Sequence, residues 1–145
     1  MSKVYEIGIC KKKGEKILKI NKIKAIKAKG IRGDRKYKEA NHKLSQITLI
    51  EIENINYFNK LIENPIPPLF FRRNIVTKGI NLNYLVGNEF YVGDVKLKAH
   101  YLCRPCRYLQ TLLMQDNFVN ELQTRGGIRC EILSTGFIYK NDKII

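Results

Sequence analysis

Two cysteines, Cys103 and Cys106, lie three positions apart in the part of this sequence best suited to chemistry. Arg104 and Arg107 stand beside them, and guanidinium groups favour the thiolate form of a neighbouring cysteine and attract anions. A strand-like alternation of apolar and polar residues ends just before the cysteines, and an apolar run typical of a helix start follows them. A thiol at such a junction suits nucleophilic or metal-binding chemistry, so we expect the other elements to present this junction.

Most of the remaining sequence predicts short strands separated by turns. We expect strands over residues 3–10, 43–50, 69–77, 128–133 and 137–139, and a hairpin over residues 87–99 that turns at Gly93 and Asp94. Helical spacing of apolar residues predicts helices over residues 51–62 and 106–114, with one helical turn near 81–85. Asp116 or Asn117 would cap a second helix that runs on to 122. The basic stretch over residues 16–29 fits either a helix or a strand. Many short strands and few helices favour a barrel-like β fold.

Two arginine-containing segments are candidates for anion binding. In a strand over residues 69–77, Arg72 and Arg73 would point to opposite faces, so one can join a site while the other is solvated. In the glycine-containing turn that ends at Arg35, Arg32 and Arg35 are candidates for binding phosphate, and Asp34 is a candidate for orienting the loop. A turn without a ligand is the simpler interpretation of that second segment.

Composition sets limits on the class of protein. The 145 residues suit one domain over residues 1–145, and 44% hydrophobic content favours a globular fold. A net charge of +14 favours anionic partners, namely nucleic acid, a membrane surface or a phosphorylated ligand, although a lysine-rich compositional bias also explains it. No apolar run has the length of a membrane span, and the first residues lack the apolar core of a secretory signal, so we expect a cytoplasmic protein. Its cysteines should then be reduced, with Cys10 and Cys130 buried as small hydrophobic side chains.

Four segments, taken in order, resemble the MOSC domain family, whose members include the C-terminal module of molybdenum cofactor sulfurases. They are Gly30-Ile-Arg-Gly-Asp34, Arg72-Arg-Asn-Ile-Val-Thr-Lys-Gly-Ile80, Leu85-Val-Gly-Asn-Glu-Phe-Tyr-Val-Gly-Asp94 leading into Cys103-Arg-Pro-Cys106, and Arg125-Gly-Gly-Ile-Arg129. The resemblance runs from about residue 4 to residue 143. A histidine often follows the Gly-Asp of the first motif in the family, and Arg35 stands there in this sequence.

The resemblance implies a fold that is mostly β with a few short helices, a single-domain MOSC-type β-barrel. It implies binding of the molybdenum cofactor, molybdopterin, with Cys106 as catalytic residue and as molybdenum ligand or sulfur acceptor. The implied activities are reduction of N-hydroxylated compounds and sulfur transfer to metal–sulfur centres, the latter as a sulfur carrier independent of pyridoxal phosphate. Residues implied to bind the cofactor's phosphate and pterin are Arg72, Arg73, Asn74, Arg104, Arg125, Arg129 and, with a weaker claim, Cys103. A sulfur donor or an electron-transfer protein would be a partner.

Four other interpretations of the sequence stay open. The two cysteines form half of a zinc site, which Cys130 and His100 would have to complete. They also match a redox-active pair, although the surrounding βαβ pattern is missing, and a packed turn with inert thiols. A non-catalytic basic β-barrel that binds nucleic acid would use the charge and the aromatic residues between the lysines, but no recognisable nucleic-acid-binding motif occurs. Exposed strand edges would permit a homodimer.

Overall fold

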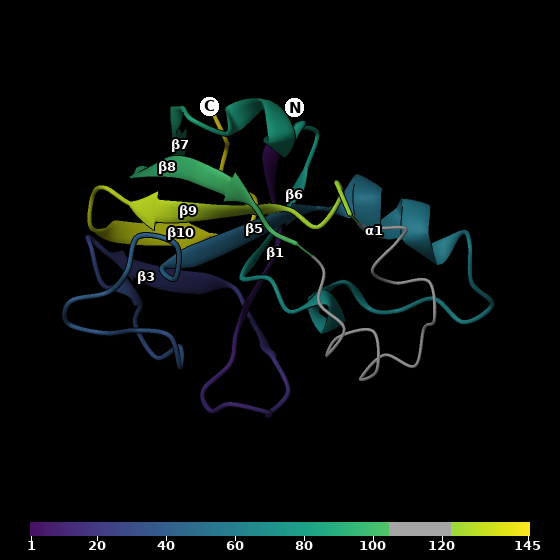
Figure 1. The fold of residues 1–145 in the computed structure, drawn as a ribbon, viewed down its shortest axis with the longest axis horizontal. Helices are drawn as coiled ribbons and strands as arrows, with labels where there is room; N and C mark the ends of the chain where they lie inside the picture. Colours follow the sequence, from purple (N-terminus) through teal and green to yellow (C-terminus); the bar gives the residue numbers. More distant parts are fainter. Residues whose placement is uncertain (105–122) are drawn as a thin grey trace.

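The computed structural model describes residues 1–104 and 123–145 of the chain (Figure 1). The strands in these residues are β1 (Lys3–Ile9), β2 (Leu18–Ile20), β3 (Lys22–Ile26), β4 (Gly30–Ile31), β5 (Ile47–Glu51), β6 (Ile75–Lys78), β7 (Glu89–Val92), β8 (Val95–Leu102), β9 (Ile128–Ile132) and β10 (Gly136–Tyr139). The helices are the α-helix α1 (Ile52–Asn59) and the 3₁₀ helices η1 (Pro68–Phe71) and η2 (Leu82–Leu85). The helices predicted over residues 106–114 and on to 122 lie outside the described residues.

The strands form a curled seven-stranded sheet and a smaller three-stranded sheet. The order in the large sheet is β2-β1-β6-β5-β9-β8-β7, with β5 and β6 parallel and the other pairs antiparallel. The C-terminal residues link its strand β7 to the start of β1. Ile145 exchanges two backbone hydrogen bonds with Tyr91, while the Ile144 N–H donates to the carbonyl of Ser2. The large sheet is curled into a half-barrel whose two sides these residues bridge, and both ends of the chain lie at the same edge of it (Figure 1).

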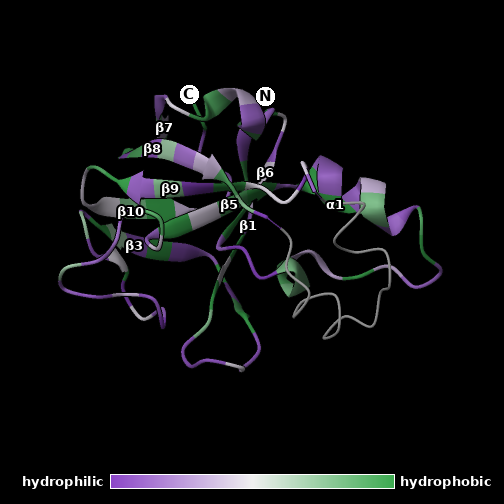
Figure 2. Cartoon of the chain, viewed as in Figure 1, coloured by the Kyte–Doolittle hydropathy of each residue, from purple (hydrophilic) through white to green (hydrophobic). Residues whose placement is uncertain are grey.

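The second sheet, of order β10-β3-β4, packs its inner face on the same core. Apolar and polar residues alternate along β8 and β9, so that one face of each strand is buried (Figure 2). Leu97, Ile132 and, from the small sheet, Ile23 and Ile138 meet in this core. Each fully buried side chain of this size stabilises the fold by about 1.5–3 kcal/mol. The prediction of a mostly β, barrel-like single domain is confirmed.

A second apolar cluster lies on the outside of β5 and β6, under α1 and η1. Phe58 of α1 and Phe71 of η1 meet there edge to face, with ring centroids 6.0 Å apart. The helix predicted to reach residue 62 ends at Asn59, because the Asn59 side chain accepts from the N–H of Ile66 and donates to its carbonyl. This pair of hydrogen bonds folds the chain back toward the barrel.

The hairpin predicted over residues 87–99 is confirmed, with Val92 opposite Val95 at its turn. The stretch over residues 16–29, left open between helix and strand, forms β2 and β3. Ile23 and Ala25 face the core and are buried, while Lys22 and Lys24 face outward, which is the two-residue period of a strand.

The single strand predicted over residues 69–77 is wrong. Residues from Pro68 to Phe71 form the 3₁₀ helix η1, and the strand β6 begins only at Ile75. Proline at the first helical position favours this turn, and Leu69 and Phe71 gain burial in the outer cluster. Arg72 ends η1 in the left-handed conformation, with φ of 62°. Consequently Arg72 and Arg73 do not alternate across a strand.

Among the described residues, no helix is long and apolar enough to cross a membrane.

Candidate functional site

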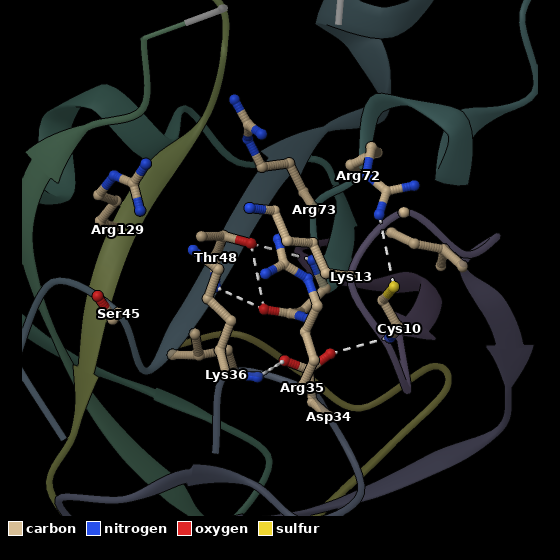
Figure 3. Close-up of a pocket in the computed structure, with 14 residues that line it drawn as sticks. Cys10, Lys13, Asp34, Arg35, Lys36, Ser45, Thr48, Arg72, Arg73 and Arg129 are labelled. Carbon is tan, nitrogen blue, oxygen red and sulfur yellow. Dashed lines mark hydrogen bonds between the residues drawn. The ribbon is translucent and has the colours of Figure 1, made fainter. Parts of the chain in front are cut away.

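A pocket of about 300 Å³ lies beside the end of β1, the start of β5 and the residues before β6, with Arg129 of β9 paired to Thr48 of β5 (Figure 3). The loops after β1 and β4 and the connection from η1 to β6 form its walls. The residues that line it are Cys10, Lys13, Gly14, Ile17, Asp34, Arg35, Lys36, Ser45, Ile47, Thr48, Arg72, Arg73, Asn74 and Arg129.

The pocket is strongly cationic. Six of its lining side chains carry a positive charge and one, Asp34, carries a negative charge; the six are Lys13, Arg35, Lys36, Arg72, Arg73 and Arg129. A cleft lined by one sign of charge concentrates counter-ions of the opposite sign. Charge repulsion among these groups is relieved when an anion enters, so the arrangement favours an anionic ligand.

Asp34 orients one wall of the pocket. Its Oδ1 accepts from the N–H of Cys10 at 2.9 Å, and its Oδ2 accepts from the N–H of Lys36 at 3.1 Å. The N–H of Arg35 donates to the Cys10 carbonyl at 2.7 Å. The loop is thus attached to the end of β1, as predicted for Asp34, and the Arg35 side chain lines the pocket while Arg32 does not.

Arg72 connects two walls of the pocket. Its Nη1 donates to the Glu15 carbonyl at 3.1 Å, and its Nη2 donates to the sulfur of Cys10 at 3.4 Å. The Cys10 thiol in turn donates to the Lys12 carbonyl at 2.9 Å. Cys10 is buried as predicted, but its thiol lies among polar groups at the pocket wall rather than in the apolar core.

Cys130 matches the expected small hydrophobic side chain, since it is fully buried in the main core. Burial raises the pKa of the Cys130 thiol well above its usual value, and the nearby Cys103 raises it further. This thiol therefore stays protonated at neutral pH and is unsuited to nucleophilic chemistry.

Asn74 holds the floor of the pocket together. Its Oδ1 accepts from the N–H of Thr48 at 3.1 Å and from the Thr48 hydroxyl at 3.2 Å, while its Nδ2 donates to the Gly8 carbonyl at 3.3 Å. Both ends of the amide are occupied by neighbouring strands. Asn74 lines the pocket as a positioning residue, and the adjacent Arg73 donates from Nε to the Gly126 carbonyl at 2.9 Å.

Lys36 and Arg129 complete the cationic lining on the other side. Arg129 donates from Nη1 to the Leu44 carbonyl at 3.2 Å. Lys36 is exposed at the pocket mouth, yet the pocket walls displace part of its hydration, and this desolvation is the main reason that its pKa is lowered. The positive charges of Arg35 and Arg129 lower the same pKa further. Both effects disfavour the charged form of the Lys36 amine, which shows that the cations of this pocket lie close enough to influence one another.

The pocket brings together only some of the residues predicted for the site: Arg72, Arg73, Asn74 and Arg129. Arg125 instead lies 3.9 Å from the ring centroid of Tyr57 and donates to Asn54 on α1 at 3.0 Å. Arg104 is exposed, and Cys103 is buried, with its N–H bonded to the Gly127 carbonyl at 2.7 Å. Cys106 lies outside the described residues, so its role stays a prediction.

Cys10, Lys13 and Lys36 are among the lining residues that were not predicted for the site. Lys13 belongs to a run of lysines beside Gly14. Because lysine is abundant in this sequence, such a run does not by itself indicate a binding site. Within residues 1–104 and 123–145, no group of three His, Cys, Asp or Glu side chains could hold a metal ion. In particular, His100 pairs with Glu131, with 2.8 Å between Nε2 and Oε1.

Comparison with known proteins identifies the family. The sequence model of the MOSC domain matches residues 36–145. The chain belongs to the MOSC domain family. The matched span contains the η1–β6 connection and β9, which carry Arg72, Arg73 and Arg129. Residues before the matched span, among them Cys10 and Arg35, supply another part of the pocket of this MOSC domain.

Solved structures of other proteins share the fold over the whole length of this MOSC domain. YuaD from Bacillus subtilis is 19% identical with a TM-score of 0.79, and the match covers 99% of this chain and 94% of that one. YiiM from Geobacillus stearothermophilus is 14% identical with a TM-score of 0.80, covering 100% and 74%. YiiM from Escherichia coli is 16% identical with a TM-score of 0.69, covering 99% and 68%. Among curated proteins, none has significant sequence similarity to this chain.

Proposed function

We propose that this MOSC protein binds the molybdenum cofactor in the cytoplasm, with the phosphorylated pterin in the cationic pocket. The observation that carries the proposal is the set of six cationic side chains around one carboxylate. Arginine's planar fork binds phosphate oxygens in pairs, and lysine binds them as a point charge. The family membership supports the choice of a pterin among anionic ligands.

The residues present fit such a group. Among the described residues, the side-chain nitrogens of Lys13, Arg35 and Lys36 have no hydrogen-bonded or ion-paired partner and so remain available to phosphate. Arg72 and Arg73 are held by backbone carbonyls, which orients their remaining N–H groups without neutralising their charge. When bound, the cofactor would supply two-electron redox chemistry or a transferable sulfur at molybdenum.

In this proposal each part of the pocket has a separate task. Lys13, Arg35 and Lys36 bind the anionic end of the cofactor, and Arg72, Arg73 and Arg129 orient it. Asp34 and Asn74 position the loops that carry these side chains. Cys106 would ligate molybdenum or accept sulfur, because soft metals prefer thiolate ligands and a thiolate is the species that carries persulfide sulfur. The activity would be reduction of N-hydroxylated compounds or sulfur transfer, with an electron-transfer protein or a sulfur donor as partner.

The test is expression in a host that makes the cofactor, followed by elemental analysis for molybdenum and fluorescence detection of the released pterin. We expect both in the wild-type protein and less of both in Arg35→Ala and Arg129→Ala. Arg32→Ala is the matched control, since Arg32 lies in the same loop as Arg35 but outside the pocket.

Cys106→Ala separates the two roles of the thiol. If Cys106 ligates the metal, this variant keeps pterin but loses molybdenum. If Cys106 accepts sulfur, the mass of the wild-type protein increases by 32 Da on incubation with a persulfide donor, while the mass of the variant does not change. The proposal fails if the wild-type protein binds neither molybdenum nor pterin and Cys106 gains no sulfur.

A further inference from the structure

The outer face of the three-stranded sheet carries aromatic and basic side chains opposite one another. In the pairing of β3 with β10, Lys24 lies opposite Phe137 and Lys22 lies opposite Tyr139. Directly opposed residues of an antiparallel pair project from the same face. The intervening Ile23 and Ile138 are buried in the core, so these four side chains face outward.

Both aromatic rings are accessible. Phe137 is 41% exposed and Tyr139 is 47% exposed. Their ring centroids are 6.1 Å apart, with 34° between the ring planes. The ammonium groups of Lys22 and Lys24 lie 5.4 and 5.7 Å from the Phe137 centroid. Two large aromatic side chains thus lie side by side on the solvent face of this sheet, with cations around them.

The charges on this face are not neutralised within the described residues. Neither Lys22 nor Lys24 forms an ion pair there. A second exposed aromatic residue opposite a lysine, Tyr91 with Lys96, differs in this respect, because Lys96 is paired with Glu89 at 2.8 Å. The face of β3 and β10 therefore presents two stackable rings and two available cations together.

We propose that this face binds single-stranded nucleic acid. Bases stack on aromatic side chains whatever their identity, and lysines bind the phosphates between them, which is the chemistry used by β-sheet platforms for single strands. The net charge of +14 adds long-range attraction for a polyanion. None of the four residues lines the cationic pocket, so this binding is a property of the protein beyond the proposed cofactor site.

The experiment measures fluorescence anisotropy of labelled 12-mers of oligo-U and oligo-dT with the full chain, at several salt concentrations. We expect Phe137→Ala and Tyr139→Ala each to weaken binding about tenfold, because one stacked base is lost. Phe137→Leu should weaken it similarly, since it keeps an apolar side chain without a ring face. Replacing both Lys22 and Lys24 with alanine should reduce the slope of log K against log salt by about 1.4, or about 0.7 for each phosphate contact. Comparing the two oligomers tells RNA from DNA.

Controls separate this face from the rest of the basic surface. Tyr91→Ala removes a ring that is 44% exposed and should bind like the wild type. Circular dichroism should show unchanged folding of every variant. The proposal is overturned if the aromatic variants bind with wild-type affinity, or if heparin, which has charge but no bases, competes with equal potency against wild type and Phe137→Ala.

Discussion

Arg72 donates a hydrogen bond to the thiol of Cys10 across 62 positions of sequence, with 3.4 Å between Nη2 and Sγ. The contact joins the end of β1 to the end of η1 and sets one wall of the cationic pocket (Figure 3). Arg72 reaches this position from the left-handed region of φ, which L-amino acids with a Cβ enter at a cost. The backbone at Arg72 and its side chain therefore have opposite effects on stability.

Two substitutions of Arg72 separate these effects. Both Arg72→Gly and Arg72→Ala remove the guanidinium, but only glycine adopts a φ of 62° without strain. We expect Arg72→Gly to be more stable than Arg72→Ala by about 1 kcal/mol in urea unfolding. Both should show the same weakened binding of inorganic phosphate by calorimetry. Equal stability of the two variants would mean that the left-handed conformation is not retained.

Gly127 should be among the least replaceable residues. It has φ of 91°, and a Cβ added there would collide with the Leu49 carbonyl oxygen on β5. We expect Gly127→Ala to lower the free energy of unfolding by about 3 kcal/mol or more, as for strained and overpacked sites. Gly14→Ala is the control, because Gly14 has φ of 84° and no atom within 4 Å of an added Cβ. Gly14→Ala should lower the free energy of unfolding by only about 1 kcal/mol. Equal losses of stability in the two variants would contradict the close approach of Gly127 to β5.

Asn74 should matter more for the fold than for contact with a ligand. Asn74→Ala leaves the Thr48 N–H and hydroxyl and the Gly8 carbonyl without their side-chain partner, so we expect a loss of about 2 kcal/mol or more in urea unfolding. Asn74→Asp keeps an oxygen that accepts both hydrogen bonds from Thr48, replaces the donor to Gly8 by a second oxygen, and adds a negative charge beside the cationic pocket, so it should be less destabilising than Asn74→Ala. If Asn74→Asp were instead the less stable variant, the hydrogen bond donated to the Gly8 carbonyl would contribute more to stability than the two accepted from Thr48.

Glu51 should make stability depend on pH. Its carboxyl is buried, and burial raises its pKa above the ordinary value of 4.5, although hydrogen bonds from Leu82 and Asn54 oppose this. The folded protein therefore binds more protons than the unfolded chain above pH 4.5, so this residue's contribution to stability falls as pH rises through the folded pKa. Urea unfolding from pH 4 to pH 8 should show this fall in the wild type relative to Glu51→Gln. If the difference in unfolding free energy between the wild type and Glu51→Gln stayed constant across this pH range, the raised pKa of Glu51 would be contradicted.

Cys130 should resist alkylation. Because burial raises the pKa of its thiol, iodoacetamide at pH 9 should leave Cys130 unmodified in the native protein and modify it after unfolding in guanidinium chloride. Peptide mass spectrometry reports each cysteine separately. Rapid native modification of Cys130 would show that the contact between β8 and β9 opens.

The sequence by itself determined the class of the fold and most strand positions. Ile23 and Ala25 alternate with lysines, and the runs on either side of Gly93 are branched and aromatic, so that only an extended chain buries their apolar faces. The order of four short motifs was enough to indicate the MOSC family, which the family match confirms. The strand patterns are local signals within ten or so residues, whereas the family signal is the order of the motifs along the chain.

The tertiary structure alone decided which side chains share the pocket. Arg72 and Arg73 were expected on opposite faces of a strand, but burial of Phe71 and a left-handed residue turn both toward one cavity. Cys10 and Arg129 join them from the end of β1 and from β9, whereas Arg125, equally basic and part of a family motif, stacks on Tyr57 instead. The reason is physical: strand pairing and hydrogen bonds such as those of Asn74 bring distant segments together, and no spacing within a segment encodes that choice.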